Sequence, residues 1–404
     1  MKFGFPKEPP GIHPSTAALT RILAYKKVRN PANEAYYSEA MLLGVGGGLD
    51  TGYVLYQFQH LTNPIIVLGF RNLWNQTLTF LEQTAQRLNL EVAFKTFTDE
   101  SEAEKALQYT LKKDDPAIVW VDKASLPYHS LPSGLQGMNT HQVTVYGRDG
   151  RLWRLYIDDL SIAPIEIREK IVTAARKKLP EKNFLMMVYK KAGALSKQDL
   201  ETAIREGIYE CALQLTRPIQ TIGISNLDIW ARKLTDRHDH MGWPQIFKDP
   251  KGLFRILCTV YEDIKLNGTE GFALRKLYSN FLHEAAGIVS NPALNGLASH
   301  YLQLANHWSN LAENALPSNI PVFDRVKKLM NKKYQAFRKN DYETHQKTYK
   351  DLETLAEKIE MTFPLNKHET YLLFERLSSQ VKLIAELELS AARRMLAISR
   401  SNIR

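Results

Sequence analysis

Cysteine is scarce in this sequence, which has only Cys211 and Cys258 among its 404 residues. Neither belongs to a Cys-x-x-Cys pair or has a histidine at zinc-ligand spacing, so the pattern excludes a disulfide framework and a structural zinc motif. The sequence also lacks the run of about 18 apolar residues that a membrane-spanning helix needs, and its N-terminus has no apolar signal-peptide core. We therefore expect a cytoplasmic protein that is not attached to a membrane.

A basic tail is missing too, although the net charge is +10 and the pI is near 9.3. Nucleic-acid binding requires a basic stripe with interleaved aromatic residues. The best candidate lies at residues 327–339 and is followed closely by Asp341 and Glu343. This pattern is more typical of a solvated helix face that could attract an acidic partner. Nucleic acid is therefore not an expected partner.

What the sequence does contain is a clear β-hairpin pattern at residues 140–159. Two runs rich in Val, Tyr, Leu and Ile flank Asp149-Gly150, and Asp-Gly favours a two-residue hairpin loop because both loop residues adopt positive φ. Symmetric pairing outward from that loop places His141 opposite Asp158, with Cβ atoms about 5 Å apart. An imidazole beside a carboxylate is the base and orienting group of a nucleophilic triad. The alternative is a surface histidine that lies beside a strand-end aspartate by chance.

The hydrophobic pattern divides the chain into two predicted domains. Residues 1–192 mix helix patterns, the first beginning at Pro14, with strand patterns such as the aromatic run at 53–58, so we predict an α+β domain there. From Ser196 to the end the pattern is helical, with Pro and Gly kept to the connections. We therefore predict an all-α domain over residues 193–404.

Two other patterns were candidates for ligand binding. The loop Gly46-Gly47-Gly48 follows a helix pattern and precedes a strand, which is the reverse of a dinucleotide fingerprint, and no Lys-Ser/Thr pair completes a P-loop. A tight turn lining a cleft is the better interpretation. The sequence His238-Asp239-His240 is more typical of a polar loop than of a metal site. We therefore predict neither a metal nor a cofactor.

Several stretches, taken in order, form a recognisable set: Gly11–Leu19, Ser38–Gly48, Val121-Asp122 with Leu126-Pro127-Tyr128, His141–Gly147 and Ile157–Asp159. Together they resemble the N-terminal domain of the butirosin-biosynthesis protein H family. In the helical half, the stretches around 223–231 and 268–286 resemble that family's companion C-terminal domain.

The resemblance implies a papain-like cysteine-peptidase fold used for acyl transfer, in which an acyl group passes from a carrier-protein thioester to an amine of a small molecule. It also implies a nucleophilic cysteine at the start of the first helix, just after the residue matching His13, where a helix N-terminus lowers the pKa of a thiol. This sequence has Pro14 at that position. By the same resemblance, His141 matches the base and Asp158 its orienting residue.

Three interpretations remain open. The first is an amide-forming acyltransferase without the cysteine, in which Ser15 is the nucleophile or His141 deprotonates an attacking amine directly. The second is a non-catalytic binding or scaffold protein of a biosynthetic pathway on the same fold. The third is an unrelated small-molecule binder.

The predicted site follows from the first interpretation. Its expected partners are a small-molecule amine or acyl substrate and an acyl-carrier protein, and the sequence leaves the oligomeric state open. The predicted catalytic residues are His141, Asp158 and Ser15, and the predicted substrate-binding residues are His13, Gly46, Gly47, Gly48 and Tyr128.

Overall fold

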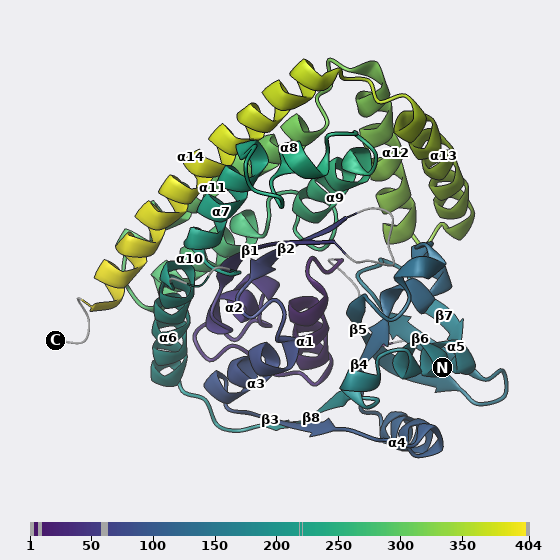
Figure 1. The fold of residues 1–404 in the computed structure, drawn as a ribbon. Helices are drawn as coiled ribbons and strands as arrows, with labels where there is room; N and C mark the ends of the chain where they lie inside the picture. The colour runs from purple at the N-terminus through teal and green to yellow at the C-terminus, as the bar shows by residue number, and fades with distance from the viewer. Residues whose placement is uncertain (1–3, 7–9, 58–63, 218, 220, 401–404) are drawn as a thin grey trace. The chain divides into compact units, whose positions relative to one another are not determined.

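The computed structural model describes residues 4–6, 10–57, 64–217, 219 and 221–400 (Figure 1). The chain forms two compact units, which interleave along the sequence. Unit 1 comprises residues 1–42, 81–200 and 332–349, and unit 2 comprises residues 43–80, 201–331 and 350–404. The units therefore differ from the contiguous division at residues 192 and 193 that the sequence suggested. Within the described ranges, no helix is both long and apolar enough to cross a membrane.

Helices and strands are mixed up to residue 192, and every later element in the described part of the chain is a helix. The first part consists of α1 (Pro14–Tyr25), α2 (Glu39–Val45), β1 (Leu49–Tyr56), β2 (Ile65–Arg71), α3 (Thr77–Arg87), β3 (Leu90–Lys95), α4 (Glu100–Lys112), β4 (Ala117–Asp122), the 3-10 turns η1 (Lys123–Ser125), η2 (Pro127–His129) and η3 (Ser133–Leu135), β5 (Thr140–Asp149), β6 (Arg154–Asp158), β7 (Ile165–Arg168), α5 (Glu169–Lys177), η4 (Pro180–Lys182) and β8 (Met186–Ala192). The second part consists of α6 (Lys197–Thr216), α7 (Ile224–Thr235), α8 (Trp243–Ile246), α9 (Leu253–Lys265), α10 (Arg275–Ile288), α11 (Ala293–Ala315), α12 (Pro321–Arg338), α13 (Tyr342–Met361) and α14 (Lys367–Arg400). The structure thus confirms a mixed α/β N-terminal region followed by a helical C-terminal region. Phe58, at the end of the predicted aromatic strand, lies outside the described residues.

Unit 1 is built on a six-stranded antiparallel sheet with the strand order β3-β8-β4-β5-β6-β7. β4 is buried at every position and reads Ala-Ile-Val-Trp-Val-Asp, as expected for a strand covered on both faces. β7 alternates buried and exposed residues at the edge of the sheet, which is the pattern of a strand with one solvated face. The position of β5 next to β4 therefore puts the predicted hairpin near the centre of the sheet.

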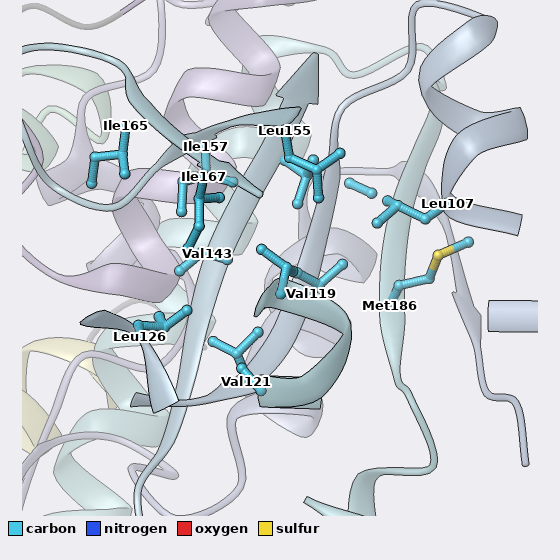
Figure 2. Close-up of a cluster of buried hydrophobic side chains, with 14 of the residues drawn as sticks. Leu107, Val119, Val121, Leu126, Val143, Leu155, Ile157, Ile165, Ile167 and Met186 are labelled. Atoms are coloured by element: carbon cyan, nitrogen blue, oxygen red, sulfur yellow. The ribbon is translucent and has the colours of Figure 1, made fainter. Parts of the chain in front are cut away.

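The two faces of this sheet pack against different helices. On one face, Val143 and Val145 of β5 join an apolar cluster with side chains of α4 and α5. Figure 2 shows part of this cluster, including Val143 and Leu107. On the other face lies α1, where Ser15 contacts Gln142 of β5. Because successive side chains of a strand point to opposite faces, this packing assigns each β5 residue to one face.

Unit 1 also includes a segment from far along the chain, residues 332–349, which we call the α12–α13 tip. Its backbone joins the turn after β6, since the Ile162 amide donates to the Arg338 carbonyl at 2.9 Å. The Asn340 side chain donates to the Pro164 carbonyl at 3.0 Å, and the Arg338 guanidinium donates to the Gly11 carbonyl. The tip is thus hydrogen-bonded both to the turn after β6 and to the segment before α1.

Unit 2 combines the two-stranded antiparallel sheet β1–β2 with most of the C-terminal helices. Its buried core includes Trp230, Trp243 and Trp308. A fully buried ion pair, Arg275 Nε to Glu388 Oε1 at 2.7 Å, connects α10 with α14. Trp308 donates to the same carboxylate oxygen at 3.0 Å, so this buried charge has several partners, as buried charges require.

Candidate functional site

β5 and β6 form the predicted hairpin, but its loop is longer than predicted. Asp149 pairs with Arg154, so the loop comprises residues 150–153 rather than Asp149 and Gly150 alone. The Asp149 carboxylate accepts the backbone N–H groups of Arg151 at 2.9 Å and Leu152 at 3.2 Å. A side chain that bonds the backbone two or three residues later forms its own turn, and here that turn replaces the tight Asp-Gly loop.

A β-bulge at Tyr146 shifts the register a second time. Val145 pairs with Ile157 and Gly147 pairs with Tyr156, so Tyr146 is the extra residue. Thr144, not His141, is consequently opposite Asp158. The prediction that His141 and Asp158 face each other is therefore wrong.

Asp158 lies instead on the α1 face of the sheet. Its carboxylate forms an ion pair with Arg21 of α1, and both side chains are buried. This contact ties α1 to β6. The structure thus gives Asp158 a packing partner other than the histidine that it was expected to orient.

The carboxylate that meets His141 belongs to the next residue, Asp159. Asp159 Oδ1 lies 2.7 Å from His141 Nε2, and Oδ2 lies 2.9 Å from both His129 Nε2 and the Tyr128 hydroxyl. We call these four residues the Asp159 cluster. All four are buried, with exposed fractions of 3% for Asp159 and at most 9% for the others.

Three short segments of unit 1 bring the cluster together. The 3-10 turn η2 presents Tyr128 and His129, and β5 presents His141. Asp159 follows the last residue of β6, and the next residue, Leu160, adopts a φ of 63°, which turns the chain back at this point. The cluster therefore depends on a turn beyond the strand rather than on cross-strand pairing.

The Asp159 carboxylate is the acidic group of the cluster, and the His129 and Tyr128 side chains are neutral donors. Burial lowers the pKa of the His129 imidazole to about 3, so this ring is neutral at pH 7 and donates one N–H. Burial, together with the adjacent Asp159 charge, raises the pKa of the Tyr128 phenol well above its ordinary value. Burial alone would raise the pKa of Asp159 as well, but its interactions with His141 and His129 hold it well below the usual range. Asp159 is therefore ionised and accepts three hydrogen bonds.

This arrangement determines the tautomer of His141. An ionised carboxylate only accepts hydrogen bonds, so the proton of a neutral His141 ring is on Nε2, facing Asp159. The lone pair is then on Nδ1, which is the nitrogen that can accept a proton. His141 and Asp159 thus have the geometry of a general base and its orienting carboxylate.

The α12–α13 tip covers the histidine side of the cluster. The Phe337 ring lies 5.0 Å from the His129 ring and 6.3 Å from the Tyr128 ring, centroid to centroid. On α13, His345 Nδ1 is 3.2 Å from the Ser130 hydroxyl. Burial lowers the pKa of His345 to about 4, so this imidazole, like that of His129, is neutral at pH 7.

The structure does not bring Ser15 to His141. Ser15 is fully buried at the start of α1, and its hydroxyl donates to Gln142 Oε1 at 3.1 Å. Gln142 and His141 are consecutive on β5, so their side chains point to opposite faces. A direct proton transfer from Ser15 to His141 is therefore not supported by this arrangement.

The Glu39 side chain lies at the N-terminus of α1, where the family resemblance implies a nucleophile. Its carboxylate accepts the backbone N–H groups of Ile12 at 2.9 Å and His13 at 2.7 Å, and the Thr16 hydroxyl at 2.7 Å. Pro14 is the first residue of the helix and has no N–H to offer. The N-terminus of α1 is thus closed by a side chain of the protein itself, and the His13 backbone contributes to this closure.

The glycine loop packs inside unit 2. Gly46, Gly47 and Gly48 are buried, and a Cβ atom on Gly48 would lie 2.6 Å from Tyr278 and 2.8 Å from Cys211. Gly47 and Gly48 also have φ values of 98° and 69°, which favour glycine. These glycines are explained by close packing, so the prediction that the loop lines a cleft is not supported.

Tyr128, one of the predicted substrate-binding residues, lines a pocket. A pocket of about 520 Å³ lies beside it in unit 1. Since the Tyr128 hydroxyl binds Asp159 Oδ2, the pocket approaches the cluster through this side chain. The other walls include Pro127, Ile165, Ile171, Asn340 and Tyr342.

Sequence reasoning found His141 and Tyr128 but missed Asp159 and His129. The bulge and the longer loop make Asp159, rather than the predicted Asp158, the partner of His141. The only sequence signal of His129 was its position next to Tyr128. The local sequence contains no sign that the residues of the α12–α13 tip join this site.

Comparison with known proteins agrees with the resemblance. The family model for the N-terminal domain of butirosin biosynthesis protein H matches residues 13–160. The model for a domain of unknown function (DUF4872) matches residues 172–322. No curated protein matches the chain. The chain therefore has the domain architecture of the butirosin protein H-like family, in which the protein H N-terminal domain is followed by this companion domain.

Proposed function

We propose that this chain is an amide-forming, acyltransferase-like protein of a biosynthetic pathway, in which His141 acts as a general base without a covalent acyl-enzyme. The observation that carries the proposal is the buried contact of 2.7 Å between His141 Nε2 and Asp159 Oδ1. It commits one ring nitrogen to an orienting carboxylate and leaves the other as the proton acceptor. The same proposal takes unit 1 as a papain-like fold.

The environments of three candidate positions for a nucleophile, residues 14, 15 and 211, support a non-covalent route. Pro14 stands where the family resemblance implies the cysteine, and Ser15 is bonded to Gln142 on the other face of β5. Cys211 is fully buried in unit 2, where burial raises the pKa of its thiol to about 12. A thiol with such a pKa is not ionised at pH 7 and is a poor nucleophile.

The proposed reaction is the aminolysis of an acyl thioester. The amine nitrogen attacks the thioester carbonyl carbon as His141 Nδ1 removes the amine proton. The new C–N bond forms, the C–S bond breaks, and the leaving thiolate takes the proton back from Nδ1. Asp159 stabilises the imidazolium that exists between the two proton transfers. General-base assistance of this kind contributes about 10²- to 10⁴-fold in rate.

The pocket beside Tyr128 is the proposed substrate entrance. Its apolar side chains, Ile165 and Ile171 among them, suit an acyl chain, and the Arg154–Glu166 ion pair lies on its wall. We propose a small-molecule amine as acceptor and an acyl-carrier protein as donor, following the family resemblance.

A panel of acyl thioesters and amines tests the proposal with wild-type protein, His141→Ala and Ser15→Ala. We expect turnover that is lost in His141→Ala and retained in Ser15→Ala, with no acyl adduct in intact-protein mass spectra. Loss of turnover in Ser15→Ala together with an acylated protein would contradict a non-covalent route.

A binding or scaffold function is the second candidate, and one observation favours it. The Asp159 carboxylate is shared by three donors and is almost completely buried, an arrangement that also stabilises a rigid framework. In that case the wild-type protein would bind a small metabolite or a carrier protein tightly and show no turnover with any member of the panel.

A further inference from the structure

We propose that His129, His141 and Asp159 form a binding site for a zinc-like divalent transition-metal ion, and that occupation of the site withdraws His141 from its role as a base. The metal site itself stands on the geometry of the Asp159 cluster. Only the inhibitory consequence rests on the proposed function. The sequence had indicated no metal site, because the three residues are separated along the chain and follow no ligand motif.

The three side chains already converge on a common point. The potential ligand atoms of His129, His141 and Asp159 all lie within 4.8 Å of one another. Each histidine directs Nε2 at a different oxygen of the same carboxylate, at 2.9 and 2.7 Å. The two rings are perpendicular, with centroids 5.3 Å apart. Both nitrogens therefore approach the carboxylate from different directions, as ligands around one ion do.

Only a small movement converts this arrangement into metal coordination. With metal–ligand distances of about 2.0–2.1 Å, a tetrahedral ion separates its N and O ligands by about 3.3 Å. The present N–O distances are 2.7 and 2.9 Å. These contacts involve different carboxylate oxygens, and the ligand atoms are spread over no more than 4.8 Å. Side-chain movements of about an ångström, with the ring protons moved from Nε2 to Nδ1, would thus admit an ion.

The donor set selects the type of ion. Two imidazole nitrogens and one carboxylate oxygen suit zinc and related transition metals, whereas calcium and magnesium prefer oxygen ligands. Three protein ligands also leave a fourth position for water or a substrate atom. We therefore expect zinc to bind and magnesium not to bind at this site.

Residues around the proposed metal ligands hold them in place, and a pocket lies nearby. The Tyr128 hydroxyl bonds Asp159 Oδ2 at 2.9 Å, which orients the carboxylate as outer partners of metal ligands usually do. Tyr128 also lines the pocket of about 520 Å³, so this pocket comes within one side chain of the Asp159 carboxylate. Phe337 packs over the His129 ring and restricts its rotation.

Metal binding and base catalysis exclude each other here. A metal on His141 Nε2 replaces the hydrogen bond to Asp159 and moves the ring proton to Nδ1, the nitrogen that must accept the amine proton. Zinc would therefore inhibit turnover, and a chelator would restore it.

The test measures zinc binding directly, by competition with a chromophoric chelator, and records the d–d absorption spectrum of the cobalt(II) form. Wild-type protein should bind one zinc ion, and cobalt(II) should give the intense visible bands of a four-coordinate site. His129→Phe keeps an aromatic ring beside Phe337 but removes one ligand, and Asp159→Asn weakens another. Each should lower zinc affinity by about a hundredfold or more, with circular dichroism confirming that the variants are folded.

The matched control removes the surface histidines that could bind zinc adventitiously. His238 and His240 lie in the loop that the sequence singled out, and His240 is 92% exposed. The double variant His238→Ala/His240→Ala should keep the stoichiometry and the cobalt spectrum of the wild type. Loss of zinc binding in this control, or unchanged affinity in a folded His129→Phe variant, would overturn the proposal.

The two proposals fail separately. Zinc binding is measured without substrate, and turnover is measured after treatment with a chelator. Zinc binding without any turnover would refute the proposed enzyme and leave the metal site standing. Turnover that zinc does not inhibit, in a protein that binds no zinc, would refute the metal site and leave the enzyme standing.

Discussion

Asp158 and Asp159 are neighbours in the sequence, but their side chains lie in different environments. Asp158 pairs with Arg21 on the α1 face, and Asp159 accepts hydrogen bonds from His129, His141 and Tyr128. The difference follows from the period of two in a strand and from the turn that begins after Asp158. Substitutions at these two positions should therefore have different effects.

Asp159→Asn should disturb the tautomer of His141. The asparagine amide offers only one acceptor oxygen, so its NH₂ group will face one of the side chains that now donate to Asp159. A histidine that accepts a hydrogen bond from this NH₂ group carries its ring proton on Nδ1 instead of Nε2. We expect any turnover to fall by about a thousandfold or more, and the imidazole signals in ¹H–¹⁵N NMR spectra to report the changed tautomer.

Asp158→Asn is the matched control. It removes the charge that Asp158 presents to the buried Arg21 guanidinium, which typically costs about 3 kcal/mol of unfolding free energy. It does not touch His141. Urea denaturation should show the loss of stability, and turnover per folded molecule should persist. The reverse result, with Asp158→Asn inactive and Asp159→Asn active, would refute this assignment.

Asp50 of β1 provides a prediction of pH dependence in unit 2. Its carboxylate accepts the N–H groups of Thr51 and Gly223 and the Gln214 side chain, at 2.7–3.0 Å. Burial nevertheless raises the pKa of Asp50 from 3.8 to about 6. A folded pKa above the unfolded value means that the proton stabilises the fold below pH 4, and this stability is lost as the pH rises through 6.

Asp50→Asn should remove this dependence, because the amide keeps an acceptor oxygen and carries no charge. The unfolding free energy of the wild type should lose up to about 3 kcal/mol more than that of the variant between pH 4 and pH 7. Urea denaturation at several pH values measures the difference. Asp228→Asn, at an exposed position of α7, serves as control, and identical pH profiles for Asp50→Asn and wild type would contradict the prediction.

At the scale of elements, the most consequential feature is the α12–α13 tip. It lies outside both matched family models, which cover residues 13–160 and 172–322, yet it covers the Asp159 cluster through Phe337. Helices that support a site from a distant part of the chain leave no local sequence signal, because the periodicity shows only that one face is buried.

Phe337→Ala tests the contribution of the tip. The ring is partly buried against the apolar cluster of unit 1, so its removal should cost about 2 kcal/mol of unfolding free energy, less than a fully buried phenylalanine. Loss of the contact should also broaden the His129 NMR signals. Tyr334→Ala on the same helix, whose ring lies beside Arg338, is the control and should leave these signals unchanged.

The hairpin shows the same limit of prediction from sequence, here within a single turn. Its existence followed from two β-rich runs around Asp149-Gly150, and the structure contains it. Its register did not follow, because the Asp149 side chain bonds the backbone of Arg151 and Leu152 and enlarges the loop. A bulge or a longer loop changes which residues face each other without changing the hydrophobic pattern that predicts the strands.

For the molecule as a whole, the interleaving of the two units makes a prediction about truncation. A fragment of residues 1–322 contains both matched family domains but lacks the α12–α13 tip and α14. It would expose the histidine side of the Asp159 cluster and leave Arg275 without Glu388, and an unpaired buried charge costs about 3–5 kcal/mol.

We expect this fragment to be insoluble or to lack a cooperative unfolding transition by circular dichroism. Co-expression with residues 323–404 should restore a folded complex, because the missing contacts are non-covalent. A fragment that unfolds cooperatively with the stability of the full chain would contradict this view of the two units.

The sequence by itself determined the elements and the family. Hydrophobic periodicity distinguishes the α/β part from the helical part, and an ordered set of motifs identifies the relationship to butirosin protein H, because both kinds of signal are local. His141 and Tyr128 could be proposed for the same reason.

Only the tertiary structure decided which groups meet. The partner of His141 depends on a bulge at Tyr146 and a loop of four residues, and the choice between Asp158 and Asp159 changes with a shift of one position. His129 and Phe337 reach the site through chain folding over long sequence distances. Such contacts depend on the packing of whole elements, which is stabilised by buried area and geometry rather than by any local residue pattern.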